Sequence, residues 1–254
     1  MRMTGHTILV TGGTSGIGLG LAEAFAARGN TVIVTGRTRA RLDALAATAP
    51  ALHGLFLDLD DPASLPALRE EVLDRFPALD VVVANAGISG REDLTAGDWH
   101  LPFAEAMIRT NVLGVLATAA AFLPVLRRQP AATFMVTGSK LAYLPSAAFP
   151  TYCGTKAFLH SWVQSLRHQW RDSGVEILEL LPPYIATELL GRSQRDDPRA
   201  MPLDVFVGET VALLDSGDHP GGEVLVERAR ADRNAEREGR YAEAFATANG
   251  GAPR

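Results

Sequence analysis

Short runs of apolar, mostly β-branched residues recur along the chain and alternate with longer segments whose apolar positions follow helical spacing. The apolar runs are continuous, which is typical of strands in a parallel sheet covered on both faces. We expect strands at residues 7–11, 31–35, 55–57, 80–84, 133–137, 176–181 and 223–226. We expect helices at residues 18–28, 39–49, 63–75, 104–127, 151–173 and 203–215.

This order predicts an α/β fold, a doubly wound parallel sheet of seven strands with helices on both faces. Asp61, followed by Pro62, is suited to cap the third helix, and Gly29 and Gly174 stand where two other helices should end. No stretch rich in Pro, Gly and Ser divides the chain. We therefore expect a single domain over residues 1–254, with a core at about 7–226 and a C-terminal tail at 227–254.

Two polar segments fall outside this alternation. Residues 191–202 (GRSQRDDPRAMP) follow the sixth expected strand. Residues 227–243 carry five arginines and five acidic residues, so their net charge is zero. Such a segment is typically a solvated helix with ion pairs four residues apart, and we favour this interpretation over a dedicated interaction arm.

The composition narrows the class of protein. The chain has 254 residues, a formal net charge of -5 and 47% hydrophobic residues, which suits a globular domain with a sizeable core. The acidic balance argues against nucleic acid as the main partner. Cys153 is the only cysteine, which suits a reducing compartment. The longest apolar stretch, residues 112–126, has 15 residues and is too short to cross a bilayer. We expect a cytoplasmic protein without a membrane partner.

The segment TGGTSGIG, at residues 11–18, follows the first expected strand and opens the first helix. Glycines let the backbone turn tightly and approach a pyrophosphate, which backbone amides and the positive end of the helix then hold. A glycine-rich turn alone is weak evidence. Here it occupies the first strand–helix joint of a doubly wound sheet, where dinucleotides bind, so we expect dinucleotide binding rather than a plain turn.

The end of the second strand bears on the choice between NAD and NADP. An acidic residue about 20 residues after the glycines would bond the ribose 2′-hydroxyl and repel a 2′-phosphate. This chain has Gly36 and Arg37 there instead. A guanidinium can bind the phosphate, so we favour NADP over NAD. The alternative is that Arg37 is a solvated charge beside Arg39 and Arg41.

Four residues point to proton transfer. Tyr152 and Lys156 are four apart in an expected helix, so they share one face. A nearby ammonium favours the phenolate, which makes proton exchange with an alcohol feasible for a phenol with an ordinary pKa of about 10. Ser139, just past the fifth strand, can steady a substrate oxygen. Asn111 lies in an apolar helix, either as a structural amide or as a link in a proton path to Lys156.

These motifs occur together in the order and at the joints found in the short-chain dehydrogenase/reductase family. TGGTSGIG, ANAG at residues 84–87, Asn111, Ser139 and the Tyr152–Lys156 pair carry the resemblance, which extends from residue 7 to about 226. YCGTKAFLHSWVQSLRHQW and PPYIATELL resemble the branch labelled DltE-like oxidoreductases. The resemblance implies a Rossmann fold and an NAD(P)(H)-dependent oxidoreductase that acts on a carbonyl or secondary alcohol.

The resemblance also implies roles for individual residues. Tyr152 is the general acid/base, Lys156 lowers its pKa and binds ribose, Ser139 orients the substrate oxygen, and Asn111 supports a proton relay. Asp58 and Leu59 resemble the adenine contact, and Thr187 is placed for the nicotinamide carboxamide. With the glycine turn and Arg37, the expected cofactor contacts are Gly12, Thr14, Ser15, Gly16, Ile17, Gly18, Arg37, Asp58, Leu59, Asn85, Ala86, Gly87, Tyr152, Lys156, Pro182, Ile185 and Thr187.

Some residues depart from the family pattern or stand out by type. Pro183 replaces a common glycine, and Gly138 replaces a frequent serine. The chain has 22 arginines and only two lysines. Lys156 has a chemical reason to remain lysine, whereas Lys140 offers only proximity to Ser139. The histidines lack ligand spacing, so we expect no metal site.

Other functions remain open on this scaffold. One alternative is epimerisation or dehydration, and another is a non-catalytic NAD(P)-binding sensor or protein-interaction module. The resemblance implies a homodimer or homotetramer through the Asn111 and Tyr152 helices, and the alanine-rich stretch at residues 117–121 permits close helix packing. Tyr184 and residues 191–202 are the candidates for contact with a small-molecule substrate.

Overall fold

The computed structural model describes residues 3–97 and 99–250 of the chain. The strands are β1 (Thr7–Val10), β2 (Thr31–Gly36), β3 (Leu52–Phe56), β4 (Val81–Ala84), β5 (Ala132–Thr137), β6 (Val175–Leu180) and β7 (Glu223–Val224). The α-helices are α1 (Gly16–Ala26), α2 (Arg39–Thr48), α3 (Ser64–Arg75), α4 (Leu101–Ile108), α5 (Gly114–Leu126), α6 (Pro150–Trp170), α7 (Arg192–Arg195), α8 (Leu203–Ser216), α9 (Glu227–Asn234) and α10 (Tyr241–Asn249). A π-helical segment, η1 (Arg109–Leu113), joins α4 to α5, and short 3₁₀ turns are η2 (Lys140–Ala142) and η3 (Pro220–Gly222).

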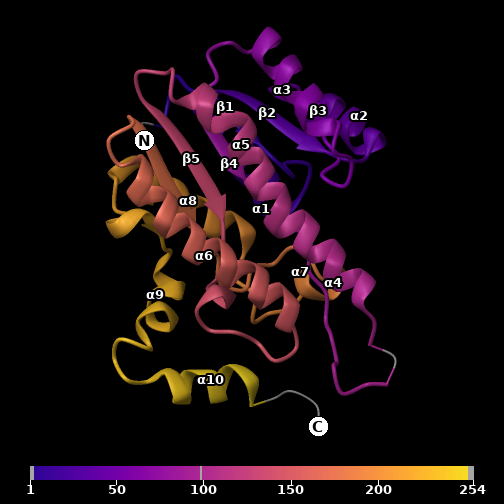
Figure 1. Ribbon diagram of the computed structural model, residues 1–254, viewed down its shortest axis with the longest axis vertical. Coiled ribbons are helices and arrows are strands. Elements are labelled where there is room, and N and C mark those ends of the chain that lie inside the picture. Colours follow the sequence, from indigo (N-terminus) through magenta and orange to yellow (C-terminus); the bar gives the residue numbers. More distant parts are fainter. Residues whose placement is uncertain (1–2, 98, 251–254) are drawn as a thin grey trace.

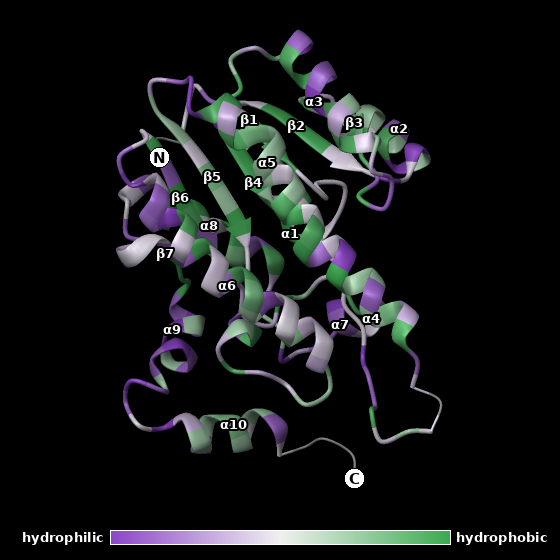
Figure 2. Cartoon of the chain, viewed as in Figure 1, coloured by the Kyte–Doolittle hydropathy of each residue, from purple (hydrophilic) through white to green (hydrophobic). Residues whose placement is uncertain are grey.

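The strands of the described chain form one parallel sheet in the order β3-β2-β1-β4-β5-β6-β7 (Figures 1 and 2). The winding direction reverses between β1 and β4, where Val10 lies opposite Val83. Ligands bind at the carboxyl ends of the strands beside such a reversal. The predicted seven-stranded, doubly wound α/β sheet is therefore confirmed as a Rossmann fold.

The core lies on both faces of this sheet because successive strand residues point to opposite sides. Ile8 and Val10 pack in a cluster with side chains of α1 and α8, and Leu9 packs in a second cluster with α3, α5 and α6. The central strands are hydrophobic along their length (Figure 2). This two-sided burial accounts for the continuous apolar runs in the sequence.

The helix expected at residues 104–127 is longer and irregular. It begins at Leu101, passes through η1 and ends at Leu126. In a π-helical turn the backbone hydrogen bonds join residues five apart instead of four, and such turns are frequent at functional sites. Asn111 lies within η1, so the irregular turn presents its side chain.

By length and composition alone, the continuous helix Leu101–Leu126 could cross a membrane. However, 56% of its most apolar window is buried within the protein. Phe122 and Leu126 are fully buried in the core. Such burial is typical of a core helix of a Rossmann sheet, and the absence of a membrane partner stays a prediction.

The expected cap of the third helix is wrong. α3 begins at Ser64, and Asp61 Oδ1 accepts a 2.9 Å hydrogen bond from the backbone N–H of Ala63, ahead of the helix. Asp61 therefore shapes the turn before α3 instead of its first helical turn. Gly29 and Gly174 have φ of +79° and +76° just beyond α1 and α6, as expected for residues that end helices.

The C-terminal segment differs from the expected solvated helix. Arg233 on α9 makes two 2.8 Å hydrogen bonds to the carboxylate of Glu223 on β7. Asp232 accepts a 2.9 Å contact from Lys140 Nζ. In the described tail, the pair within α9 is three residues apart, between Arg230 and Glu227. This hydrophilic helix (Figure 2) is thus docked on the sheet edge through its charges.

Candidate active site

The glycine-rich turn lies at the carboxyl end of β1 and leads into α1. Gly12 and Gly16 have φ of +65° and +54°, which side chains other than glycine rarely adopt. A Cβ on Gly12 would lie 2.8 Å from Ala86 Cα, and one on Gly18 would lie 2.5 Å from Asn85 Nδ2. The turn therefore requires glycine both for its conformation and for its close approach to the segment after β4.

Thr11 and Asn85 fasten this turn to the end of β4. Thr11 Oγ1 accepts hydrogen bonds from the backbone N–H groups of Asn85 (3.0 Å) and Ala86 (3.1 Å). Asn85 Nδ2 donates to Thr11 O (3.1 Å), and Asn85 Oδ1 accepts from Thr137 Oγ1 (3.2 Å). The side chain of Asn85 thus holds three strand ends together, while the backbone of residues 85–87 lines the site.

The N-terminus of α1 is suited to hold a dinucleotide phosphate. Ser15 precedes the helix in an extended conformation, and its side chain makes no capping hydrogen bond. The first amides of this 11-residue helix therefore keep their donors for an anion. A Cβ on Gly16 would lie 3.6 Å from Thr187, so the turn also adjoins the segment after β6. The cradle fits a nicotinamide dinucleotide.

The segment after β2 is exposed and basic. Arg37 follows β2 with an exposed side chain, and no ion pair joins it to any residue that the structure describes. Arg39 differs, because its guanidinium lies 4.6 Å from the centre of the Phe56 ring. At the next strand end, Asp58 Oδ1 accepts a 3.0 Å hydrogen bond from the backbone N–H of Asp60. Arg37 therefore remains available to a phosphate.

The structure brings Ser139, Tyr152 and Lys156 together, as the sequence predicted. Lys156 lies 5.6 Å from the centre of the Tyr152 ring and donates a 2.7 Å hydrogen bond to the carbonyl oxygen of Thr137. Ser139 lies close enough to Tyr152 to act on its pKa. Ser139 Oγ also accepts from the backbone N–H of Leu141 (3.1 Å), which fixes the serine after β5.

The two titrating groups have pKa values moved by burial. Burial raises the pKa of Tyr152 to about 12, and the nearby Ser139 hydroxyl works in the opposite direction. Burial lowers the pKa of Lys156 to about 8, against the opposing effect of the Glu179 carboxylate. In the protein alone the pKa of Tyr152 is therefore raised, in contrast to the expected lowering, and Lys156 is not among the groups that move it.

Asn111 is a fixed part of the site. Its amide exchanges two hydrogen bonds with the backbone of Ile88, at 2.8 and 2.9 Å, and donates to Thr155 Oγ1 at 3.2 Å. Thr155 in turn donates to the carbonyl oxygen of Tyr152 at 2.7 Å. The amide thus joins the loop after β4 to the helix of Tyr152, and a proton relay to Lys156 stays a prediction.

A buried acidic residue that was not predicted from the sequence lies behind Lys156. Glu179 on β6 is fully buried, and its Oε2 lies 2.7 Å from Nδ1 of His160, on the same helix as Lys156. Its Oε1 has no hydrogen-bond partner among the described residues. A Cβ on Gly138 would lie 2.6 Å from this Oε1, which explains glycine before Ser139. A glutamate inside the apolar run EILELL was the available signal.

The segment after β6 closes the far side of the site. The carbonyl oxygen of Pro182 accepts a 3.0 Å hydrogen bond from the backbone N–H of Lys140. Ile185 is bridged to Met201, and its carbonyl oxygen accepts from Gln194 Nε2 at 2.9 Å. Thr187 is buried beside the glycine turn. The glycine turn, residues 85–87, the group of Ser139, Tyr152 and Lys156, and the segment after β6 therefore meet at the carboxyl ends of the strands.

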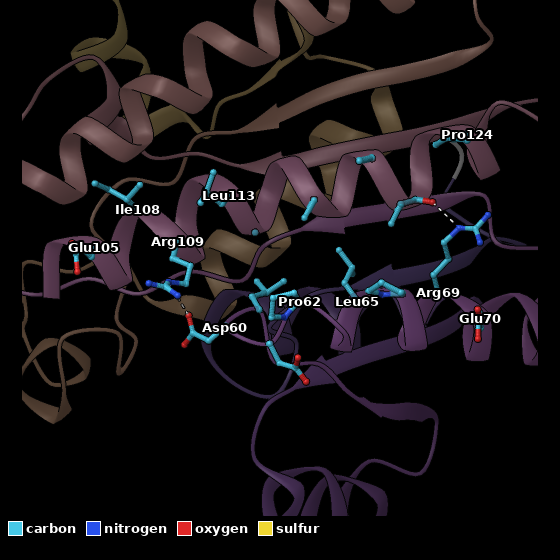
Figure 3. A pocket seen from close by; sticks show the side chains of 17 residues that line it. Asp60, Pro62, Leu65, Arg69, Glu70, Glu105, Ile108, Arg109, Leu113 and Pro124 are labelled. Carbon is cyan, nitrogen blue, oxygen red and sulfur yellow. Dashed lines mark hydrogen bonds and ion pairs between the residues drawn. The ribbon is translucent and has the colours of Figure 1, made fainter. Parts of the chain in front are cut away.

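Two cavities lie outside this cluster. One of about 420 Å³ adjoins the start of α6. The other, of about 930 Å³, is a groove between α3 and the α4–α5 helix (Figure 3). Asp60 and Arg109 face each other across its mouth at 3.9 Å, and of the predicted cofactor contacts Leu59 lines it. In the described residues, no group of three His, Cys, Asp or Glu side chains could hold a metal ion.

Comparison with known proteins relates the chain to one family. The model of the family described as short chain dehydrogenase matches residues 6–198. Over 194 residues, the chain is 41% identical to the uncharacterized oxidoreductase DltE of Bacillus subtilis (strain 168). The matched region covers 76% of this chain and 77% of that protein. It is 34% identical over 187 residues to a serine 3-dehydrogenase of Agrobacterium fabrum (strain C58 / ATCC 33970), covering 72% and 73% of the two chains.

Solved structures show the same relationship. A short-chain dehydrogenase from Sphingobium yanoikuyae in complex with NADPH has a TM-score of 0.78 and 28% sequence identity, covering 94% of this chain and 95% of that one. Other solved chains of similar fold are complexes with NADP or with NAD. Proteins that resemble this chain thus bind either cofactor.

Proposed function

The chain belongs to the short-chain dehydrogenase/reductase family, and we propose that it is an NAD(P)(H)-dependent oxidoreductase that interconverts a carbonyl group and a secondary alcohol. The observation that carries this proposal is that Ser139, Tyr152 and Lys156 lie together at the carboxyl ends of the central strands, beside the glycine turn. The name of the related serine 3-dehydrogenase is consistent with chemistry at an alcohol carbon.

In the proposed reduction, a bound nicotinamide cofactor supplies the hydride. The Tyr152 hydroxyl gives its proton to the substrate oxygen, and the hydrogen bond of Ser139 orients that oxygen against Tyr152. The Lys156 ammonium stabilises the phenolate that remains, because opposite charges at short range favour the ionised form. Oxidation uses the same groups in reverse.

NADP is the proposed preferred cofactor. Arg37 is exposed and unpaired among the described residues, and the second strand ends without an acidic residue that would repel a 2′-phosphate. The proposed location is the cytoplasm, because a chain with a single cysteine is suited to a reducing compartment. Residues 1–254 are proposed to act as one domain.

A homodimer or homotetramer is the proposed assembly. Leu113 and Phe158 are exposed on the helices of Asn111 and Tyr152. Leu113 also lines the groove between α3 and α5 (Figure 3), together with Ala117, Ala121 and Pro124. Apolar surface of this kind is typical of a subunit contact. Light scattering that shows a monomer at micromolar concentration would contradict this assembly.

The variant Tyr152→Phe tests the reaction. We expect it to bind NADPH with unchanged affinity by calorimetry and to reduce no carbonyl substrate, because the ring remains while the transferable proton is lost. Retained turnover in this variant would exclude Tyr152 as the acid/base.

A further inference from the structure

The cavity of about 420 Å³ is built from three segments that continue from the proposed active site. Residues 89–91 follow the loop after β4, Phe149 precedes Tyr152 by three residues, and residues 184–199 follow Pro182. A volume of this size is sufficient for a small molecule. The cavity is therefore placed to receive the part of a substrate that extends away from the reacting carbonyl.

The loop that carries Arg91 is anchored next to Tyr152. Glu92 accepts hydrogen bonds from the backbone N–H (3.0 Å) and the hydroxyl (2.8 Å) of Thr151, the residue before Tyr152. The backbone N–H of Glu92 donates to Ala148 O at 3.0 Å. The Arg91 guanidinium lies 5.6 Å from the centre of the Phe149 ring. These contacts hold a cation at the cavity wall close to the catalytic helix.

The charges that line this cavity do not cancel. Asp197 accepts hydrogen bonds from Arg199 Nη2 (2.7 Å), Arg199 Nε (3.0 Å) and the Tyr184 hydroxyl (3.3 Å). These contacts hold the pKa of Asp197 below its usual range, so its carboxylate stays ionised. The adjacent guanidinium of Arg199 balances this negative charge. Among the cavity-lining residues, Arg91 is the cation for which the described residues offer no carboxylate. One positive charge therefore remains for a ligand.

We propose that Arg91 binds the anionic group of the substrate, so that the enzyme acts on small carbonyl compounds bearing a carboxylate or a similar anion. This proposal rests on the proposed oxidoreductase function. Ser89 and Ser193 line the same cavity and add hydroxyl donors. A guanidinium binds a carboxylate through two parallel hydrogen bonds, which fixes the orientation of the carbonyl relative to Tyr152.

The test compares matched substrates in the full-length protein. Reduction of acetoacetate and acetoacetamide, and of 4-oxopentanoate and its methyl ester, is followed with NADPH. Arg91→Met keeps an unbranched side chain against Phe149 without the charge. We expect it to lower kcat/KM for the anions by about 10- to 100-fold and for the neutral partners by less than about threefold. Arg91→Lys should recover part of the loss.

A control variant separates a local contact from the general field of the protein. Arg128→Gln removes an exposed positive charge just beyond α5, outside the cavity lining, and should leave the ratio between anionic and neutral substrates unchanged. Equal loss on both substrates of a pair in Arg91→Met, or no loss on either, would overturn the assignment of Arg91. If the wild-type protein reduces neutral carbonyls as well as anions, the oxidoreductase function stands and the anion site does not. If it turns over no carbonyl or alcohol, the function itself fails.

Discussion

The ammonium group of Lys156 donates a 2.7 Å hydrogen bond to the carbonyl oxygen of Thr137, at the end of β5 and inside the protein. This contact fixes the cation beside the ring of Tyr152. This one hydrogen bond does not compensate for the hydration that the buried ammonium loses, so the pKa of Lys156 falls to about 8. The charge needed beside Tyr152 is thus lost within the pH range of an ordinary assay.

The pH profile of reduction should therefore report Lys156. Below about pH 8 the lysine is charged, and above it the charge is lost, so the phenolate left after proton transfer is no longer stabilised. Tyr152, with a pKa of about 12, stays protonated throughout. We expect kcat/KM for reduction to be constant near neutral pH and to fall above about pH 8. Rates measured at limiting substrate give this profile, which reports the pKa values of the free enzyme. A rate that keeps rising well beyond that pH would contradict this role.

Removal of the buried carboxylate should move that profile. Glu179 raises the pKa of Lys156, so Glu179→Gln should lower it further and shift the alkaline limb to lower pH. The groups that face Glu179 from other elements include His160 and Arg167 on α6, Tyr143 after η2, and Arg233 on α9. They are unchanged in this variant, so the shift isolates one charge.

Glu176→Gln is the matched control for that experiment. Glu176 lies on the same strand, and its side chain is partly exposed. It is not among the groups that move the pKa of Lys156. The same loss of one negative charge should therefore leave the alkaline limb in place. An identical limb in wild type and Glu179→Gln would show that Glu179 serves only to bind His160.

The sequence was sufficient to predict the parallel sheet, the glycine turn and the proximity of Lys156 to Tyr152. These features depend on local patterns: apolar runs, glycines at a strand–helix joint, and two residues on one helical face. The partner of Lys140 could not be predicted, because Asp232 is 92 residues away in a tail whose charges suggested solvent. The π-helical turn at Asn111 was also missed, since an added residue per turn leaves no mark in an apolar stretch.

Gly138 and Glu179 show the same limit in the core. The chain departs from the family at Gly138, but the reason is the carboxylate that reaches it from the neighbouring strand. The sequence predicts which residues lie on adjacent strands, whereas the direction of a buried, partly unpaired side chain depends on the packing around it.

Cofactor preference should change with the charge at residue 37. Arg37→Asp replaces an exposed cation with an acid that can bond a ribose 2′-hydroxyl and repels a phosphate. We expect kcat/KM for NADPH to fall by about 10- to 100-fold relative to NADH, as measured on one carbonyl substrate. Arg41→Gln, a neutralised arginine on the exposed start of α2, should keep the wild-type ratio. Wild-type preference for NADH would refute NADP as the preferred cofactor.

Space beside Ser139 should limit substitution at Gly138. A Cβ there would lie 2.6 Å from Glu179 Oε1 and 2.9 Å from Leu181 Cδ2, and both groups are buried. Gly138→Ala should therefore lower the free energy of unfolding by about 1–3 kcal/mol in urea titrations. Gly208→Ala provides the control, since nothing lies within 4 Å of that Cβ on the exposed face of α8. Alanine should stabilise the helix there by about 0.5–1 kcal/mol.

A double-mutant cycle identifies the cause of the loss at Gly138. Glu179→Ala removes the carboxylate that the new methyl group would meet, so Gly138→Ala should cost less in that background than in the wild type. Leu181 still limits the space, so part of the cost should remain. If the cost is equal in both backgrounds, the backbone at residue 138 and not the Glu179 side chain requires glycine.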